Sequence, residues 1–549
     1  MKNNRLMLLA ATAMPLLFAS AGSRAGDAAG HAKDPVEKPP HLQTDAVTTD
    51  GSVTVGGQPV PYQAVAGTLV VHAKGWDDSA APDSEKDRNA GDDGNPTAQA
   101  SMFYVAYLKK GAKPEDRPIT FLFNGGPGSS SVWLHMGAFG PRRVVTADDT
   151  HTPMAPYKVV NNAQSLLDAS DLVFIDAPGT GFSRIAGKDK EKQFFGVDQD
   201  ARAFTDFITQ FLSHYGRWNS PKFLFGESYG TPRAAVVVNE LEQEREVDFN
   251  GVILLSQILC FDASGDAPET NPGVDLPYVV ALPTYAATAW YHHKLPGQQT
   301  DLAHLLTDVE RFADTDYAAA LQQGAALDPA RRDAIAQKLH DYTGLPVDYI
   351  RKADLRINVG MFQHELQEDE GKYVGRFDTR FSGPGMDPLS KQAEYDPQSA
   401  GISSAYVSAF NDYVRRSLNY GQDKTYKPDI MIEDWDTKHQ QPGQSQAQPG
   451  PLNVLPDLAA ALKYNPRLKV LLNAGYYDLA TPFYEGITEM RHLPMSRDLQ
   501  NNIEYKQYSS GHMVYAHQES LQALHDNVAD FIRRASLPQD QPGHPSNGG

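Results

Sequence analysis

The pentapeptide Gly226-Glu227-Ser228-Tyr229-Gly230 constrains the fold of this chain more than any other stretch. The apolar run at 222–225 predicts a buried strand before it, and residues 232–241 predict a packed helix after it. A serine on a sharp strand-to-helix turn adopts a strained backbone and presents its hydroxyl beyond the sheet, while flanking glycines avoid clashes. Backbone N–H groups at the helix start can hold a developing negative charge. Pentapeptides of this form also occur by chance in loops, so the interpretation depends on the flanking strand and helix.

Strand-like and helix-like segments alternate along the chain before and after this turn. Short apolar runs predict buried strands, and longer segments with an apolar stripe predict helices. The strands are expected at 119–123, 171–176, 251–255, 469–472 and 503–508, and the helices at 198–215, 455–463 and 517–535. This alternation indicates an α/β fold with a mostly parallel central sheet and helices on both faces.

Two other regions interrupt the alternation. Near the N-terminus, a hairpin is predicted within 52–71, a mobile surface loop at 76–99, and a strand at 100–109 that alternates like an edge strand. Residues 261–451 form a mainly helical insertion, expected to be a cap over the site, between core segments 46–260 and 452–537. Its helices are expected at 278–293, 302–313, 330–342 and 403–420.

The first 25 residues have the features of a secretory signal peptide. Lys2 and Arg5 precede an apolar stretch, 6–18, that is too short to span a bilayer, which disfavours a retained membrane anchor. Small residues allow cleavage after Ala21 or Ala25. We therefore expect an exported protein, periplasmic or extracellular, with no integral membrane segment after signal removal. Polar composition predicts a disordered leader at 26–45 and a disordered tail at 538–549.

Charge and cysteine content limit the partners and the covalent framework of the chain. The net charge of −19 argues against nucleic acid or an anionic membrane surface as a partner. Cys260 is the single cysteine, so no intrachain disulfide can form, and its position after an apolar run suggests a packing role. No cysteine cluster or His-Glu-x-x-His motif indicates a metal site.

A serine nucleophile needs an imidazole to accept its proton and a carboxylate to orient that imidazole. In a sheet of this type the acid and the base follow the serine in the chain, on loops after later strands. Asp478 follows the strand at 469–472, and His512 follows the strand at 503–508. Asp176 also ends a strand, but it precedes the serine and is interpreted as a structural loop residue.

A glycine-rich turn at 124–131 follows the strand at 119–123. Such turns can hold phosphate, but no Gly-Lys-Ser/Thr follows here, so a nucleotide site has little support. The alternative is a nest of backbone N–H groups that faces the serine. The sequence thus indicates no cofactor.

Together these motifs resemble those of serine carboxypeptidases, exopeptidases with the α/β-hydrolase fold. The likeness is carried by residues 124–131, 176–183 and 226–230, the Asp478 loop and Gly511-His512-Met513. The resemblance implies an α/β-hydrolase fold and a role for each matching residue. By this resemblance Ser228 would be the nucleophile, His512 the general acid and base, and Asp478 the acid that orients His512. The N–H groups of Gly126 and Tyr229 would form the oxyanion hole. The substrate carboxylate would be bound by Asn124, Gly125 and Glu227.

Two positions depart from the family pattern. The family usually has a disulfide-bonded cysteine where this chain has Ser129. Family members often carry a second glutamate at the position of Ala138, where it pairs with the glutamate of the serine turn. A carboxyl group donates a hydrogen bond to a carboxylate only while it is protonated. The role implied for Glu227 therefore requires a raised pKa without help from that partner.

The sequence predicts an exported serine carboxypeptidase that removes C-terminal residues from peptides through a Ser-His-Asp triad and an acyl-enzyme. Its partners would be peptides with a free C-terminal carboxylate; no motif indicates the preferred side chains or the oligomeric state. An esterase or acyltransferase on the same scaffold would use the same triad without needing Asn124 and Glu227. A catalytically silent binding protein is disfavoured, because all three chemical positions are present.

Overall fold

The computed structural model describes residues 42–74, 98–297, 301–387, 389–391 and 393–537. The expected signal peptide, the tail at 538–549, and most of the expected leader and of the loop at 76–99 lie outside the described residues. The first described strand, β1, begins at Asp45. Among the described helices, none has the length and apolar character needed to cross a membrane.

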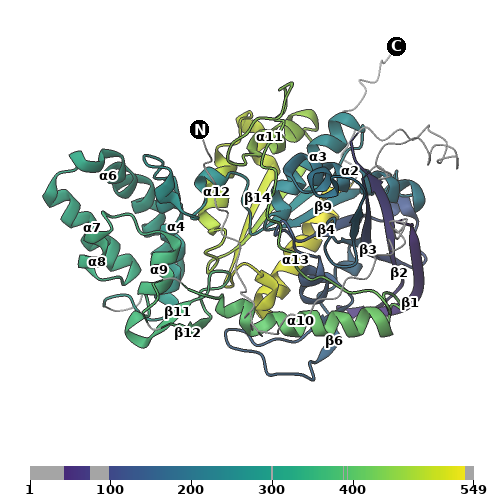
Figure 1. The fold of residues 1–549 in the computed structure, drawn as a ribbon, viewed down its shortest axis with the longest axis horizontal. Coiled ribbons are helices and arrows are strands. Elements are labelled where there is room, and N and C mark those ends of the chain that lie inside the picture. Colours follow the sequence, from purple (N-terminus) through teal and green to yellow (C-terminus); the bar gives the residue numbers. More distant parts are fainter. Residues whose placement is uncertain (1–41, 75–97, 298–300, 388, 392, 538–549) are drawn as a thin grey trace, which may run out of the picture.

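A ten-stranded sheet lies at the centre of the larger part of the molecule, in the order β1-β2-β3-β7-β4-β9-β10-β13-β14, with β8 paired to β3 (Figure 1). In the run β7-β4-β9-β10-β13-β14 each strand is parallel to the next, whereas β1, β2, β3 and β8, and the junction of β3 with β7, pair in antiparallel fashion. This confirms the α/β-hydrolase fold with a mostly parallel sheet. The strands are β1 (Asp45–Val55), β2 (Gln58–His72), β3 (Gln99–Lys109), β4 (Ile119–Phe123), β7 (Asp171–Ile175), β8 (Arg184–Ala186), β9 (Lys222–Glu227), β10 (Gly251–Leu255), β13 (Lys469–Gly475) and β14 (Ile503–Tyr508).

Apolar side chains on both faces of the strands form two separate cores, as expected for a sheet covered by helices on each side. In β4, Phe121 and Phe123 face one core and Leu122 faces the other. The first core is covered by α2 (Val197–His214), α3 (Gly230–Glu244) and α11 (Leu455–Tyr464), and the second by α10 (Pro397–Arg416) and α13 (Gln518–Ala535). Short α1 (Lys190–Phe194) precedes α2.

The prediction that residues 100–109 form an edge strand is wrong. Strand β3 lies between β2 and β7, and β2 pairs with it over its whole length. Side chains on both faces of β3 are buried, and its tyrosine hydroxyls find polar partners inside the protein. Tyr104 bonds the Tyr215 hydroxyl at 2.6 Å, and Tyr107 bonds His135 at 2.7 Å.

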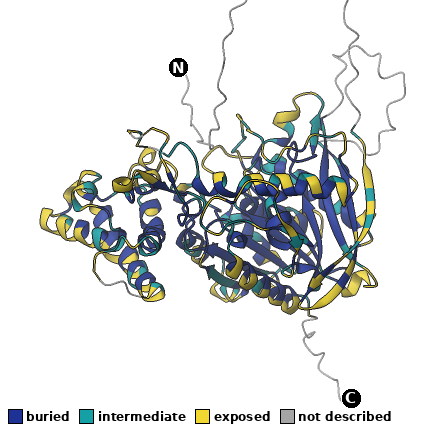
Figure 2. Cartoon of the chain, turned by 90° about the horizontal axis from the view of Figure 1, so that it is seen from below, coloured by how far each residue is buried: buried dark blue, intermediate teal, exposed yellow. Residues whose placement is uncertain are grey.

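The segment after β10 forms a helical lobe beside the sheet, with its own apolar core (Figures 1 and 2). Its elements are α4 (Leu276–Tyr291), α5 (Leu302–Phe312), α6 (Ala318–Gln323), α7 (Pro329–Thr343), α8 (Val347–Lys352), α9 (Val359–Glu365), β11 (Lys372–Val374) and β12 (Ser382–Pro384). The expected helix at 403–420 is α10, which begins earlier because Asp396 caps it and Pro397 occupies its first turn. Residues 421–451 contain no helix and pair at single bridges with loops of the sheet.

Candidate active site

Ser228 occupies the turn between β9 and α3 with a positive φ of 59°. This is the strained strand-to-helix turn that the pentapeptide predicts. The flanking glycines are required sterically: a Cβ on Gly226 would lie 2.0 Å from the Gly230 carbonyl oxygen. A Cβ on Gly230 would lie 2.9 Å from the Phe123 carbonyl oxygen. The close packing of the turn against β4 therefore leaves the Ser228 hydroxyl at the carboxyl end of the sheet.

His512 and Asp478 meet beside this turn, on the loops that follow β14 and β13. The His512 Nδ1 atom lies 2.8 Å from Asp478 Oδ2. The same carboxylate accepts hydrogen bonds from the N–H groups of Ala480 (2.9 Å) and Thr481 (3.0 Å) and from the Thr481 hydroxyl (2.7 Å). Asp478 is fully buried, and these four donors satisfy the hydrogen-bonding capacity of its two carboxylate oxygens.

Backbone contacts bring His512 and Ser228 to the same end of β10. The Ser228 N–H donates to the Leu255 carbonyl at 3.0 Å, and the adjacent Ser256 hydroxyl donates to the His512 carbonyl at 2.6 Å. Among the described residues, the Ser228 hydroxyl forms no hydrogen bond with the imidazole. Such contacts are often long in free enzymes and shorten when substrate binds.

The charge state of His512 reflects two opposing effects. Burial disfavours the charged imidazole, but the Asp478 carboxylate beside it raises the pKa of His512 overall, and Glu227 acts in the same direction. The orienting carboxylate thus makes the imidazole a stronger base. This is the property that a proton acceptor for a serine hydroxyl needs.

The glycine-rich turn at 124–131 lies directly against the serine turn. A Cβ on Gly125 would fall 2.3 Å from the Tyr229 nitrogen, so only glycine permits this approach. Within the described part of the chain, neither the Gly126 nor the Tyr229 N–H group has a hydrogen-bond partner. Two free donors beside a serine can stabilise an oxyanion.

Two buried charged groups support the glycine-rich turn, and the sequence analysis singled out only the first of them. Asp176, interpreted as a structural loop residue, accepts hydrogen bonds from the Ser131 N–H (2.8 Å) and hydroxyl (2.7 Å). Arg233 of α3 donates to the Asn124 carbonyl at 2.6 Å and pairs with Asp200 at 2.6 Å. The turn is therefore held from both sides.

Glu227 lies under the serine turn and is 2% exposed. Burial raises its pKa to about 7, against the opposing effects of the His512 charge and of hydrogen bonds from Tyr515 and Asn124. The Tyr515 hydroxyl donates to both carboxyl oxygens, at 2.9 and 3.1 Å. Asn124 is also buried, and its Oδ1 atom accepts the Leu134 N–H at 3.1 Å.

Tyrosine rings pack against the residue next to the position where family members often carry a second glutamate. Ala138 is fully buried in a π-helical turn, Leu134–Phe139, and carries no polar group. A Cβ on the adjacent Gly137 would lie 2.7 Å from both the Tyr406 and the Tyr515 ring. Tyr515 follows His512 by three residues on one loop, which is the signal that could have identified it from the sequence.

A segment of the insertion, residues 376–380, contacts the loops that carry Asp478 and His512, and it was not singled out in the sequence. The Phe377 carbonyl accepts the His512 N–H at 2.6 Å, and the Arg376 carbonyl accepts the Leu479 N–H at 3.0 Å. Asp378 accepts the Gly511 N–H at 3.2 Å and pairs with buried Arg380 at 2.7 Å. This segment therefore connects the loops that carry Asp478 and His512.

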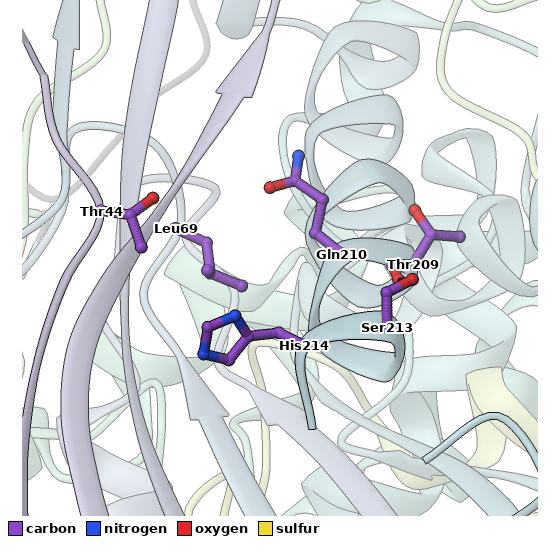
Figure 3. Close-up of a pocket in the computed structure, with 6 residues that line it drawn as sticks. All are labelled: Thr44, Leu69, Thr209, Gln210, Ser213 and His214. Carbon is purple, nitrogen blue, oxygen red and sulfur yellow. Dashed lines mark hydrogen bonds between the residues drawn. The ribbon is translucent and has the colours of Figure 1, made fainter. Parts of the chain in front are cut away.

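The groove in Figure 3 lies elsewhere and does not contribute to this site. It is lined by Thr44 and Leu69 near β1 and β2 and by Thr209, Gln210, Ser213 and His214 of α2 (Figure 3). Helix α2 ends here, shortly before β9 begins, whereas Ser228 follows the opposite end of β9. Ser228, His512, Asp478 and Glu227 are not among the residues that line this groove.

A family model described as "Serine carboxypeptidase" matches residues 93–525. Among curated relatives, "Pheromone-processing carboxypeptidase KEX1" of Yarrowia lipolytica is 33% identical over 145 residues, 26% of this chain and 22% of that protein. A "Serine carboxypeptidase-like" protein of Oryza sativa is 31% identical over 135 residues, 24% of this chain and 29% of that protein. These matches span less than a third of the relatives' lengths.

Solved structures give a weaker comparison. A proline iminopeptidase of Mycobacterium smegmatis aligns over 90% of this chain and 100% of its own, with 12% identity and a TM-score of 0.31. A carboxyl esterase of Bacillus coagulans aligns over 86% and 99%, with 12% identity and a TM-score of 0.33. At these scores the likeness carries no argument about activity.

Proposed function

Because the chain belongs to the serine carboxypeptidase family, we propose that it releases the last residue of peptides with a free C-terminal carboxylate. The observation that carries this proposal is the buried Glu227 carboxyl, which interacts electrostatically with His512 and has a pKa raised to about 7. While protonated, this group can donate a hydrogen bond to a substrate carboxylate beside the nucleophile. A simple esterase has no need of such a group.

The proposed first step forms an acyl-enzyme. His512 Nε2 accepts the Ser228 proton as Oγ attacks the scissile carbonyl carbon, and Asp478 stabilises the imidazolium. The N–H groups of Gly126 and Tyr229 donate to the carbonyl oxygen as it becomes negatively charged. His512 then protonates the leaving amine as the C–N bond breaks, and the C-terminal amino acid departs.

The second step reverses these roles with water as the nucleophile. His512 accepts a water proton as the oxygen attacks the acyl carbon, and it returns that proton to Ser228 Oγ as the ester bond breaks. The shortened peptide then leaves with a new carboxylate. The triad therefore acts on any acyl group, whereas Glu227 and Asn124 select substrates that end in a carboxylate.

Paired substrates test this function. The protein is incubated with an N-blocked dipeptide, with its C-terminal amide and with an N-blocked amino acid ester, and released products are quantified by chromatography. We expect amino acid release from the dipeptide acid and much slower reaction of the amide. Turnover of the ester without cleavage of the dipeptide acid would instead indicate the esterase or acyltransferase alternative.

We also propose that the chain is exported to the periplasm or beyond the cell. The basic start, the short apolar stretch at 6–18 and the following small residues support this proposal. Expression of the full chain, followed by cell fractionation and sequencing of the mature N-terminus, tests it. A protein that keeps Met1 and stays in the cytoplasmic fraction would contradict export.

A further inference from the structure

Arg143 is a half-buried cation with no carboxylate partner. It lies in β5 (Arg142–Val144), which follows the π-helical turn and pairs with β6 (Val159–Asn161). Its Nη2 atom donates to the neutral Gln518 side chain at 2.6 Å. Its Nε atom is buried and has no hydrogen-bond partner among the described residues. Within that part of the chain, no carboxylate forms a salt bridge with Arg143.

The fully buried arginines among the described residues are, in contrast, paired with acids. Arg233 pairs with Asp200 at 2.6 Å, and Arg380 pairs with Asp378 at 2.7 Å. Burial of a guanidinium is costly unless an anion and hydrogen bonds compensate for the lost water. At Arg143 this cost is evident, since burial lowers the pKa of the group. Arg143 therefore has an unmet capacity to bind an anion.

Arg143 lies close to the region that contains Glu227. Tyr406 lies near both groups, because its hydroxyl interacts electrostatically with the Arg143 and Glu227 charges. The Tyr406 ring packs against Gly137 together with the Tyr515 ring, and Tyr515 bonds Glu227. Gln518, which binds Arg143, follows Tyr515 by three residues. Arg143 thus lies along the side of the site where Ala138 replaces a second carboxyl group.

We propose that Arg143 binds the C-terminal carboxylate of the peptide substrate, as a specificity-determining residue that compensates for the carboxyl group absent at Ala138. The proposal rests on the proposed carboxypeptidase function. A guanidinium offers planar, paired N–H donors that match a carboxylate, and Arg143 forms no salt bridge within the described residues. Such a contact favours substrates with a terminal charge over amides and esters.

The test compares Arg143→Gln with Arg142→Gln as a matched control. Successive side chains of a strand point to opposite faces, and the Arg142 charge acts on Tyr62 and Tyr107 rather than on Tyr406. For the dipeptide acid, Arg143→Gln should raise KM roughly 10- to 100-fold, the effect expected for a lost charge-assisted hydrogen bond. The ratio of kcat/KM for the acid to kcat/KM for the ester should fall by the same factor, and the control should keep it.

The outcomes separate this proposal from the proposed function. If the native protein cleaves the dipeptide acid and Arg143→Gln leaves its KM unchanged, the role of Arg143 is overturned while the carboxypeptidase function stands. If the native protein turns over only the ester, the function itself is wrong. Should Arg143→Gln fail to fold, Arg143→Lys replaces it. That variant keeps the charge without the planar fork, and a native KM for it would also overturn the proposal.

Discussion

The two sides of the site differ in how fully their polar groups are satisfied. Asp478 accepts four hydrogen bonds, including the one from His512. On the other side, Glu227 is a buried carboxyl with a raised pKa, and Arg143 has a buried nitrogen without a partner. The Asp478 carboxylate is fully hydrogen-bonded without a ligand, whereas Arg143 on the other side keeps a nitrogen without a partner among the described residues.

From this difference we infer different roles for the two sides, catalysis for the Asp478 side and substrate recognition for the Glu227 side. A catalytic group must be held in place before substrate arrives, and saturated hydrogen bonding achieves that. A recognition group must keep donors free for the ligand, at some cost to the empty protein. Changes on the Asp478 side should therefore lower kcat for every substrate. Changes on the Glu227 side should alter KM only for substrates that end in a carboxylate.

The largest effect is expected for Ser228→Ala, which removes the nucleophile. Turnover of both peptide and ester should fall by about 10⁶-fold, as for other serine nucleophiles. Binding of the dipeptide acid, measured by calorimetry, should persist because Glu227 and Arg143 remain. Residual turnover within a hundredfold of the native rate would mean that another residue attacks the carbonyl.

A smaller but still general loss is expected for Asp478→Asn. The amide cannot hold His512 in the tautomer that accepts the serine proton, and kcat should fall by about 10⁴-fold. Peptide and ester should lose the same factor, which single-turnover kinetics can measure. A loss restricted to the peptide would contradict the division between the two sides.

The sequence predicts the framework of the site well because that framework is local. Strand β14, expected at 503–508, is found at Ile503–Tyr508, and Ser228 occupies the expected turn. Apolar runs and glycine spacing encode these features directly. The loops that carry Asp478 and His512 then follow from the order of the strands.

Contacts between distant segments could not be predicted in this way. Asp378 and Arg380 are distant in sequence from the loops they support, and no local pattern distinguishes them from surface charges. Arg143 resembles an ordinary strand residue until its neighbours are known. Helix α12 (Phe483–Arg491) was missed as well, because its buried Glu485 and Glu489 make an internal segment look exposed.

Asp378→Asn tests whether the segment 376–380 belongs to the catalytic side. Arg380 would lose its buried partner and keep only the half-exposed Asp148 carboxylate at 3.3 Å, which should lower the free energy of unfolding by about 3 kcal/mol. The Gly511 N–H would also lose a charged acceptor, so kcat should fall about tenfold for peptide and ester alike. Chemical denaturation and steady-state kinetics measure the two effects.

A double variant, Asp378→Asn with Arg380→Met, separates the two contributions. It removes the buried Arg380 charge, which Asp148 alone compensates only in part, so much of the lost stability should return. The kcat should remain low, because the His512 loop still lacks its charged acceptor. Full recovery of kcat together with stability would show that the segment supports the fold rather than the geometry of the base.

The smallest effect is expected for Glu227→Gln, and it should be visible mainly as a changed pH dependence. Below about pH 7 the native carboxyl is protonated and donates to the substrate carboxylate; above it, the ionised group repels that carboxylate. The native KM for the dipeptide acid should therefore rise by about tenfold per pH unit above the pKa. The glutamine amide donates at every pH, so the KM of the variant should stay nearly constant.

Two further measurements sharpen this prediction. The native protein binds the Glu227 proton between its ordinary pKa of 4.5 and about 7, so this group lowers the free energy of unfolding as the pH rises through that range. Glu227→Gln should reduce that slope. Because the Glu227 charge also raises the pKa of His512, the variant should reach full ester turnover at a lower pH. A KM for the dipeptide acid that still rises steeply above pH 7 in the variant would assign the titration to another group and remove Glu227 from the recognition side.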